Sequence, residues 1–220
     1  GADVIKVERP KYGDDTRAWG PPFLKDEDGN DTSEAAYYLS ANRNKRSIEV
    51  DLASPEGIKL VKDLAKHCDV LVENFAPGVM DRLGLGWDVL HALNPKLVYG
   101  TGTGYGLSGP DRDNLAMDVT IQASSGIMSV TGMPDGPPMR SGASLVDFLS
   151  GVHLYAGIMT ALFERTRTNK GRLVEVSMQE TAYPTLASKI GLLYRNDGTM
   201  PPRVGNRHGG LALAPYSVYE

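Results

Sequence analysis

The stretch "DVLVENFAPGVMDRLGLGWDVLHALNPKLVYGTGTG", residues 69–104, contains the pattern that decides the fold. Its short apolar runs at 69–74 and 97–104 are typical of buried strands. Residues 77–95 between them predict two short helices joined at Gly84–Gly86. Buried strands that alternate with helices usually have parallel neighbours. We therefore expect an α/β fold with a mainly parallel sheet.

The alternation of strands and helices continues on both sides of this stretch. We expect further strands at 4–8, 46–52, 172–178 and 214–220, and helices at 54–68, 116–126, 179–195 and from near Asp147 to residue 171. Residues 9–34 are polar and rich in Gly, Pro and Asp, which predicts one long loop. In parallel sheets, ligands bind at the carboxyl ends of the strands.

The composition limits the classes of partner. The 220 residues have a net charge of −4, so we expect no bulk attraction to nucleic acid or to an anionic membrane. No apolar run reaches a membrane-spanning length without polar interruption, so we expect no transmembrane helix. The single cysteine, Cys68, cannot form an intramolecular disulfide, which is compatible with a reducing, cytoplasmic location. Both ends of the chain are strand-like, and we expect an internal piece of a longer protein.

Several short motifs have a functional and a plain structural interpretation. The run "GYGLSG", residues 104–109, fits G-x-G-x-x-G, but "PDRDN" follows it where a dinucleotide site needs a helix, so we favour a glycine-rich loop. Glu8 and Arg9 end the first strand, where they could hold a ribose hydroxyl and a phosphate or be solvated charges. The basic run 42–47 leaves the same two interpretations open.

The histidines do not have metal-binding spacing, so we expect no metal site. We expect His153, on the long apolar helix, to be a satisfied core residue. His208 lies with Arg207 in the glycine-flanked run "GNRHGGLA", which could close over a polar ligand. A serine nucleophile is not supported, because the chain has no G-x-S-x-G elbow.

Asp147 is the one carboxylate near the start of the apolar stretch 142–165. An ionised carboxylate in apolar surroundings needs partners or takes up a proton. It could cap the helix by accepting hydrogen bonds from backbone N–H groups, or it could act in catalysis. Spacing alone favours the cap.

Taken together, segments along the whole chain resemble the class III CoA-transferases, the formyl-CoA transferase and carnitine dehydratase-related family. The matching segments are "GADVIKVERP", "GDDTR", "NRNKRSIEVDL", "DVLVENFAPGVMDRLGLGW", "LNPKLVYGTGTGYGLSGP", "MPDGPP", "SGASLVDFLSG" and "NKGRLVEVSMQE". The segments at 13–23 and 37–48 are most similar to succinyl-CoA:dicarboxylate transferases of the glutarate-accepting kind.

The resemblance implies a Rossmann-like CoA-binding large domain over residues 1–200, incomplete at both ends. Residues 201–220 would then be a linker with a glycine loop and the start of a small domain. Family members are interlocked homodimers, so a homodimer of the full-length protein is implied. The piece 1–220 alone is expected to be inactive.

The resemblance also assigns site residues. Matches to CoA-contacting positions are Arg9, Val50, Asp51, Leu52, Ala53, Asn74, Phe75, Ala76 and Arg82. Trp19 matches a gating tryptophan, and His208, Gly209 and Gly210 lie in the region of a flexible glycine loop. Leu115 stands where formyl-CoA transferase has a CoA-contacting lysine, so that contact is expected to be lost or replaced.

The family's catalytic aspartate matches Asp147, which reverses the preference for a cap. The resemblance implies that this carboxylate attacks an acyl-CoA thioester and forms a mixed anhydride and then an aspartyl-CoA thioester. The acceptor is a carboxylic acid. Coenzyme A is a substrate, and no permanently bound cofactor or metal is needed. We expect the helix N-terminus to keep Asp147 ionised and to help stabilise oxyanions, and we expect the site to be dry.

Two alternatives remain open. The related α-methylacyl-CoA racemases use the histidine of a "GHD" motif, but the matching tripeptide here is Ala116-Met117-Asp118, and methionine cannot carry the proton. The other alternative is a non-catalytic piece that binds CoA or a partner chain without turnover.

Overall fold

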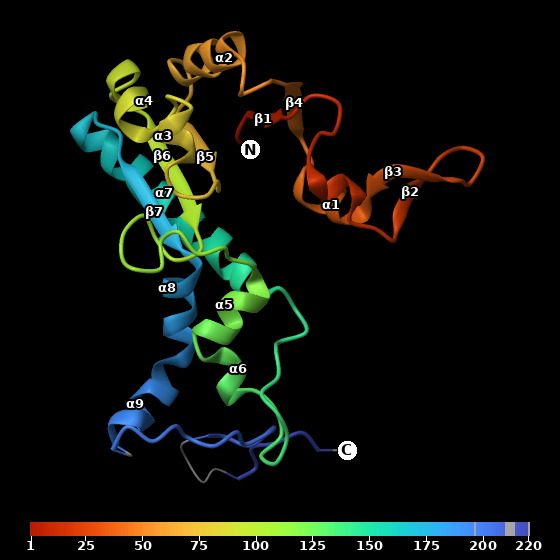
Figure 1. Cartoon of the computed structure of the whole chain (residues 1–220), viewed down its shortest axis with the longest axis vertical. Helices are drawn as coiled ribbons and strands as arrows, with labels where there is room; N and C mark the ends of the chain where they lie inside the picture. The colour runs from red at the N-terminus through yellow and green to blue at the C-terminus, as the bar shows by residue number, and fades with distance from the viewer. Residues whose placement is uncertain (196, 210–213, 220) are drawn as a thin grey trace. The chain divides into compact units, whose positions relative to one another are not determined.

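The computed structural model describes residues 1–195, 197–209 and 214–219 (Figure 1). Its contacts divide the chain into two compact units, Gly1–Asp63 and Leu64–Glu220. We describe each unit by itself. The predicted domain boundary near residue 200 stays a prediction.

The first unit is built on two parallel strands. β1 (Val4–Glu8) pairs with β4 (Lys45–Glu49) in a register that runs from Val4↔Lys45 to Glu8↔Glu49. The connection contains η1 (Asp15–Ala18), the antiparallel hairpin β2 (Phe23–Lys25) and β3 (Asp31–Ala35), and α1 (Ala36–Ala41). α2 (Pro55–Ala65) follows β4.

The expectation that residues 9–34 form one loop is wrong, because this segment contains β2 and β3. The hairpin turn is held by the Asp26 carboxylate, which accepts from the N–H groups of Asp28 at 3.0 Å and Asn30 at 2.8 Å. An ion pair between Lys25 and Asp31 links the two strands at 2.7 Å. β2 has only three residues and β3 is mostly polar, so neither shows the apolar alternation by which a sequence indicates a strand.

The second unit has a three-stranded parallel sheet in the order β5-β6-β7, namely β5 (Val70–Glu73), β6 (Val98–Thr103) and β7 (Leu173–Ser177). The first crossover contains α3 (Val79–Arg82) and α4 (Trp87–Leu93), the two short helices that the sequence predicts. The second crossover contains the long helix α7 (Leu145–Thr168). The α/β class with parallel strands is thus confirmed.

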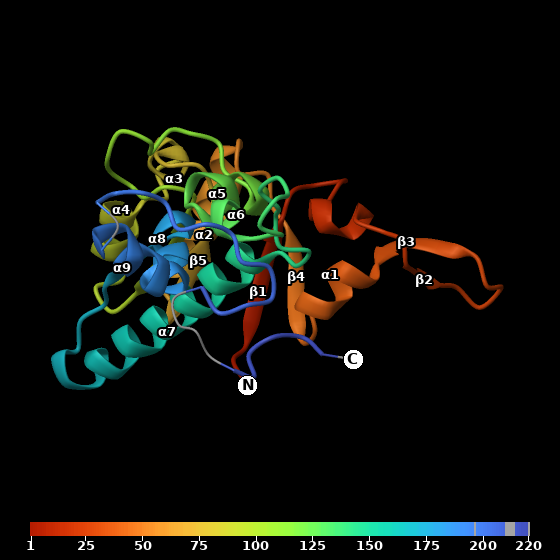
Figure 2. The same ribbon diagram turned by 90° about the horizontal axis from the view of Figure 1, so that it is seen from below.

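Helix α7 packs closely on the central strand. Ile158 and Ala161 of α7 and Val98 of β6 form a buried cluster. A Cβ atom at Gly100 of β6 would lie only 2.8 Å from the Ile158 side chain, so the close approach of helix and strand requires glycine there. Figure 2 shows α7 as one continuous helix.

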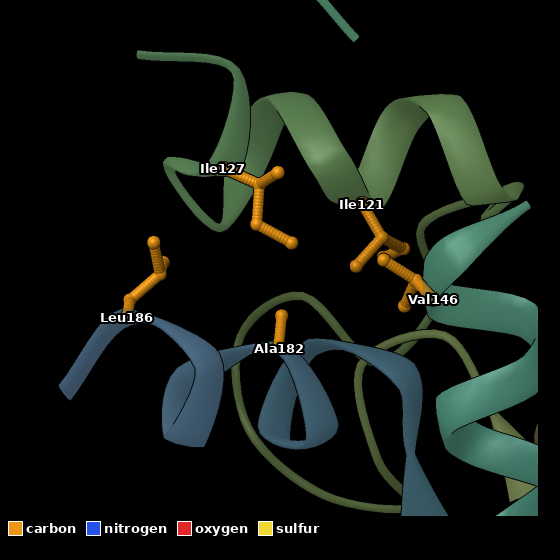
Figure 3. Packing of buried hydrophobic residues seen from close by; sticks show 5 residues of the cluster. All are labelled: Ile121, Ile127, Val146, Ala182 and Leu186. Atoms are coloured by element: carbon orange, nitrogen blue, oxygen red, sulfur yellow. The ribbon is translucent and has the colours of Figure 1, made fainter. Parts of the chain in front are cut away.

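A second core holds the first turn of α7 in place (Figure 3). It joins α5 (Asp118–Ser124), α6 (Ile127–Val130), α8 (Met178–Ala182) and η2 (Tyr183–Leu186), which is followed by α9 (Ala187–Arg195). Its buried members are Ile121, Ile127, Val146, Ala182 and Leu186. In Figure 3, Ile121 of α5 points toward Val146 of α7, so the start of α7 is fixed against α5.

Three further expectations differ from the structure. No strand forms over the described residues 214–219, where no neighbouring strand is present to pair with. His153 is exposed rather than in the core, and its Nδ1 atom lies 2.8 Å from the Leu149 carbonyl oxygen.

Among the described residues, α7 is long and apolar enough to cross a membrane by length and composition, contrary to the sequence expectation. Its buried residues nevertheless pack against β6 and β7, as in the core helix of an α/β unit.

Candidate active site

Asp147 is the third residue of α7 and does not cap it. The N-cap position is Ser144, whose side chain makes no capping hydrogen bond. The capping interpretation of Asp147 is therefore wrong. A sequence containing Ser144 and Asp147 within one turn cannot by itself show where the helix begins, since both residue types are common caps.

The acceptor for the first turn of α7 comes from another helix. Asp118, the first residue of α5, accepts through Oδ2 from the N–H of Val146 at 2.7 Å and the N–H of Asp147 at 3.3 Å. The other oxygen, Oδ1, accepts from the Gln122 side-chain amide. Gln122 is fully buried, and its Oε1 accepts from the N–H of Ser141 at 2.7 Å. A partly buried chain of hydrogen bonds therefore holds the start of α7.

The Asp147 carboxylate is exposed, and no group in the described ranges 1–195, 197–209 and 214–219 donates a hydrogen bond to it. Partial burial and, after it, the negative charge of Asp118 raise the pKa of Asp147 above its usual range. The nearby N–H groups bond to Asp118 and to the carbonyl of Ser144, not to the Asp147 carboxylate. That Asp147 stays ionised in the full-length protein stays a prediction. The side chain faces solvent in this chain, and a dry site in the full-length protein stays a prediction.

Arg9 and the residues after β4 lie in the first unit, at the carboxyl ends of β1 and β4. Arg9 is exposed, forms an ion pair with Asp15 and lies over the Tyr12 ring, 5.6 Å from its centroid. The matched positions Val50–Ala53 form a turn after the strand rather than its end: the N–H of Val50 donates to the Glu8 carbonyl at 2.9 Å. The Asp51 carboxylate accepts from the N–H of Ala53 at 2.9 Å.

Glu8 is neither a free ribose partner nor a solvated charge. It is 4% exposed, and Arg17 donates to both of its oxygens, at 2.9 and 3.0 Å. Further donors are the Ser47 hydroxyl at 2.7 Å, the Tyr38 hydroxyl at 3.2 Å and the Asp14 N–H at 2.8 Å. Arg17 is the main cause of a Glu8 pKa far below its usual range. Glu8 thus ties the turn before Trp19 to β1.

Trp19, the predicted gating residue, is 54% exposed and follows η1 directly. Its ring lies 5.3 Å from that of Tyr37. Its role as a gate stays a prediction.

In the second unit, Asn74, Phe75 and Ala76 follow β5 at its carboxyl end and are exposed. The Glu73 carboxylate accepts from the N–H of Phe75 at 2.8 Å and shapes this turn. Arg82 is the last residue of α3 and is also exposed. The structure leaves all four side chains accessible, and their contact with CoA stays a prediction.

The glycine-rich run 104–109 forms a loop at the carboxyl end of β6, as expected. The Thr103 hydroxyl accepts from the N–H of Gly106 at 2.9 Å, and Glu175 accepts from the N–H of Leu107 at 2.5 Å. No helix begins before Asp118 in this part of the described chain. The dinucleotide interpretation thus lacks the helix that it requires.

His208 and Gly209 line a pocket of about 280 Å³ together with Lys189 of α9 and Arg207. Gly210 lies outside the described residues. The Lys189 Nζ atom is buried and has no hydrogen-bond partner among the described residues. A Cβ atom on Gly209 would lie 1.7 Å from it, so a larger residue there would require the Lys189 side chain to move. The pocket is therefore positively charged.

Sequence reasoning missed Asp118, Gln122 and Lys189. Asp118 and Gln122 are four residues apart on α5, a spacing that brings side chains together on a helix. This spacing could have indicated from the sequence that the two side chains interact. Lys189 has no comparable signal, because its burial depends on a segment that lies close only in the folded chain.

Comparisons with known proteins identify the family of this chain. The model of the family described as "CoA-transferase family III" matches residues 1–220. A succinate–glutarate CoA-transferase from Agrobacterium fabrum is 43% identical over 218 residues, covering 99% of this chain and 54% of the relative. An acetyl-CoA:oxalate CoA-transferase from Acetobacter aceti is 40% identical over 221 residues, covering 100% of this chain and 54% of the relative.

A solved structure of a CAIB/BAIF family protein from Brucella suis matches with a TM-score of 0.88 at 41% identity, over 99% of this chain and 56% of that one. The structure of Rv3272 from Mycobacterium tuberculosis matches with a TM-score of 0.79 at 34% identity, over 90% of this chain and 52% of that one. The chain belongs to CoA-transferase family III. It spans about half the length of the curated relatives it matches. The family resemblance seen in the sequence is thereby confirmed.

Proposed function

We propose that the full-length protein transfers CoA from an acyl-CoA to a carboxylic acid, with Asp147 as the nucleophile. The observation that carries this proposal is the state of the Asp147 carboxylate. It is exposed, has no donor among the described residues and has a raised pKa. A carboxylate without hydrogen bonds, and more basic than usual, is a stronger nucleophile when ionised.

The reaction follows from this nucleophile. A carboxylate oxygen of Asp147 attacks the thioester carbonyl, the C–S bond breaks, and CoA leaves as a thiolate. The thiolate then attacks the aspartyl carbonyl of the mixed anhydride, which forms an aspartyl-CoA thioester and releases the donor acid as its carboxylate. An acceptor carboxylate repeats the two steps in reverse and regenerates Asp147. Each step exchanges acyl groups, so no oxidant, metal or nucleotide is consumed.

We propose that CoA contacts Arg9, the turns at Val50–Ala53 and Asn74–Ala76, and Arg82. Each turn follows the carboxyl end of a parallel strand in its own unit, the edge where α/β sheets bind ligands. The exposed Arg9 and Arg82 are suited to phosphate groups. CoA would be a substrate only. Among residues 1–195, 197–209 and 214–219, no cluster of His, Cys, Asp and Glu is suited to a metal ion.

We propose a dicarboxylate as the acceptor and succinyl-CoA as the donor, in line with the succinate in the name of one relative. The relatives named for glutarate and oxalate act on dicarboxylic acids. In this chain, Lys189 and Arg207 line a pocket together with His208 and supply positive charge for an anion. A screen of mono- and dicarboxylic acids with succinyl-CoA tests this proposal, and equal rates for both kinds of acid would contradict it.

We further propose a cytoplasmic homodimer, the assembly that the family resemblance implies. α7 offers a candidate contact, because large apolar side chains are exposed along it: Phe148, Val152, Tyr155, Met159 and Phe163. Exposed apolar patches commonly mark interfaces. Light scattering on the full-length protein should give twice the mass of one chain, and the mass of a single chain would contradict the proposal.

Replacing Asp147 with Asn tests the nucleophile. Asn has nearly the same shape but cannot form the anhydride, so exchange should fall by more than about 1,000-fold while CoA binding survives. Asp88→Asn, a change of an exposed first-turn acid in α4, is the matched control and should keep full activity. Hydroxylamine should trap the acylated wild type at Asp147.

The same experiment separates the alternatives. Near-normal exchange by Asp147→Asn, or an adduct on another carboxylate, would exclude Asp147 as nucleophile. Deuterium wash-in at the α-carbon of a 2-methylacyl-CoA would favour a racemase, although Met117 is 63% exposed and has no proton to exchange. Thermal stabilisation by CoA without acyl exchange would favour a non-catalytic CoA-binding chain.

A further inference from the structure

We propose that Asp118 is the positioning residue for Asp147. It accepts hydrogen bonds from N–H groups in the first turn of α7 and thereby fixes the position of the nucleophile. This inference rests on the proposed function of Asp147. Asp118 itself makes no attack on the substrate in this proposal.

The first support is the hydrogen bonding of the helix start. The opening N–H groups of an α-helix have no acceptor within the helix and need one from elsewhere. In α7 the N-cap side chain of Ser144 does not supply it, and Asp118 accepts from Val146 and Asp147 instead. One of these two N–H groups belongs to the nucleophile's own residue, so the bond acts directly on the backbone that carries the carboxylate.

The second support is that Asp118 is itself held. Its other oxygen accepts from Gln122, and Gln122 accepts from the N–H of Ser141, six residues before Asp147 in the chain. One turn further along α5, Ile121 packs against Val146 in the buried core (Figure 3). Polar and apolar contacts therefore fix the start of α7 from the same helix, and a rigid support of this kind is what a positioned catalytic group requires.

The third support is electrostatic. Asp118 adds a second negative charge near Asp147 and contributes to its raised pKa, after partial burial. The other ionisable side chains on elements packed against α7 are Tyr99 of β6, Glu175 of β7 and Glu180 of α8. None of these three is a cause of the Asp147 shift. Asp118 is thus the one charge that tunes the basicity of the nucleophile among the described residues.

The arrangement has a chemical consequence. The N–H groups of Val146 and Asp147 are occupied by Asp118, so they are not available to stabilise an oxyanion. The first turn of α7 orients the Asp147 carboxylate, and the charge of Asp118 contributes to its raised pKa. A helix with a free N-terminus would instead hold the carboxylate by hydrogen bonds and lower its reactivity.

The experiment compares Asp118→Asn and Asp118→Ala in the full-length protein. Asn keeps one acceptor oxygen but removes the charge, whereas Ala removes both. We expect kcat to fall by up to about 100-fold in Asp118→Ala, because small misplacements of a reacting group are costly. The KM for acyl-CoA should stay within about threefold, since Asp118 does not bind CoA. Asp88→Asn should change neither parameter.

The second readout does not depend on turnover. In Asp118→Asn the Asp147 pKa should fall, so a carbon-13 carboxyl titration of Asp147 should move to lower pH, and the acid limb of kcat/KM should move with it. Hydroxylamine should still trap Asp147 in both variants.

An unmoved Asp147 titration together with unchanged kcat would overturn the positioning role, and so would a loss expressed in KM alone. If wild-type protein transfers no CoA, the proposed function fails, yet the carboxyl titration still decides whether Asp118 acts on Asp147. If Asp118→Ala does not fold, Asp118→Asn decides the outcome by the same two readouts.

Discussion

Glu8 in the first unit is the last residue of β1, and Asp147 in the second unit lies in the first turn of α7. The two carboxylates differ in burial and in hydrogen bonding. Glu8 is buried and accepts from Arg17, Ser47, Tyr38 and the backbone. Asp147 is exposed and has an acidic neighbour, Asp118, but no donor among the described residues. The pKa is lowered for Glu8 and raised for Asp147.

This difference separates a structural acid from a reactive one. A carboxylate with every lone pair occupied stabilises the fold but has no electron pair left for attack. A carboxylate without donors contributes no hydrogen bond to stability and keeps its oxygens available. The position of each residue in its strand or helix does not show which carboxylate is structural and which is reactive. The hydrogen-bond donors and charges around each carboxylate do.

Removing the cation from Glu8 should give the largest effect. Arg17→Ala leaves a buried carboxylate without its main partner, which should lower the free energy of unfolding by about 3 kcal/mol. Chemical denaturation measures the loss. Arg9→Ala breaks an exposed ion pair with Asp15 and should cost less than about 1 kcal/mol. Equal losses of unfolding free energy in Arg17→Ala and Arg9→Ala would contradict the expected difference between the buried and the exposed ion pair.

Replacing Glu8 with Gln should give a smaller loss that depends on pH. The folded pKa of Glu8 lies below the unfolded value of 4.5, so its charge stabilises the fold above that value. The stability difference between wild type and Glu8→Gln should be about 2 kcal/mol at neutral pH and shrink as pH falls below 4.5 toward the folded value. A difference that is constant from pH 7 to pH 3 would show that lost packing, not charge, is responsible.

Asp147→Asn should give the smallest change in stability, with the opposite sign. The raised pKa means that the ionised form is disfavoured in the folded protein, so removing the charge should stabilise it at neutral pH. The gain should be under about 0.5 kcal/mol, since the side chain is exposed. It should vanish as pH falls below the unfolded pKa. A loss of stability at neutral pH would mean that Asp147 has a structural partner after all.

The sequence by itself determined the α/β class, the two short helices between β5 and β6, and the parallel strands β1, β4, β5, β6 and β7. These features follow from runs of apolar residues and turn residues that are neighbours in the chain. The similarity of segments along the whole chain also identified the family. The hairpin β2–β3 was not predicted, because β2 has only three residues and β3 is mostly polar.

The tertiary structure alone decided what each carboxylate does. Arg17 is nine residues from Glu8 and Ser47 is 39, while Asp118 reaches the N–H of Asp147 across 29 residues. Hydrophobic periodicity describes one element at a time, but the donors and charges around a carboxylate come from elements that meet only when the chain folds. A pKa depends on those neighbours, so the reactive acid could be distinguished from the structural one only after they were in place.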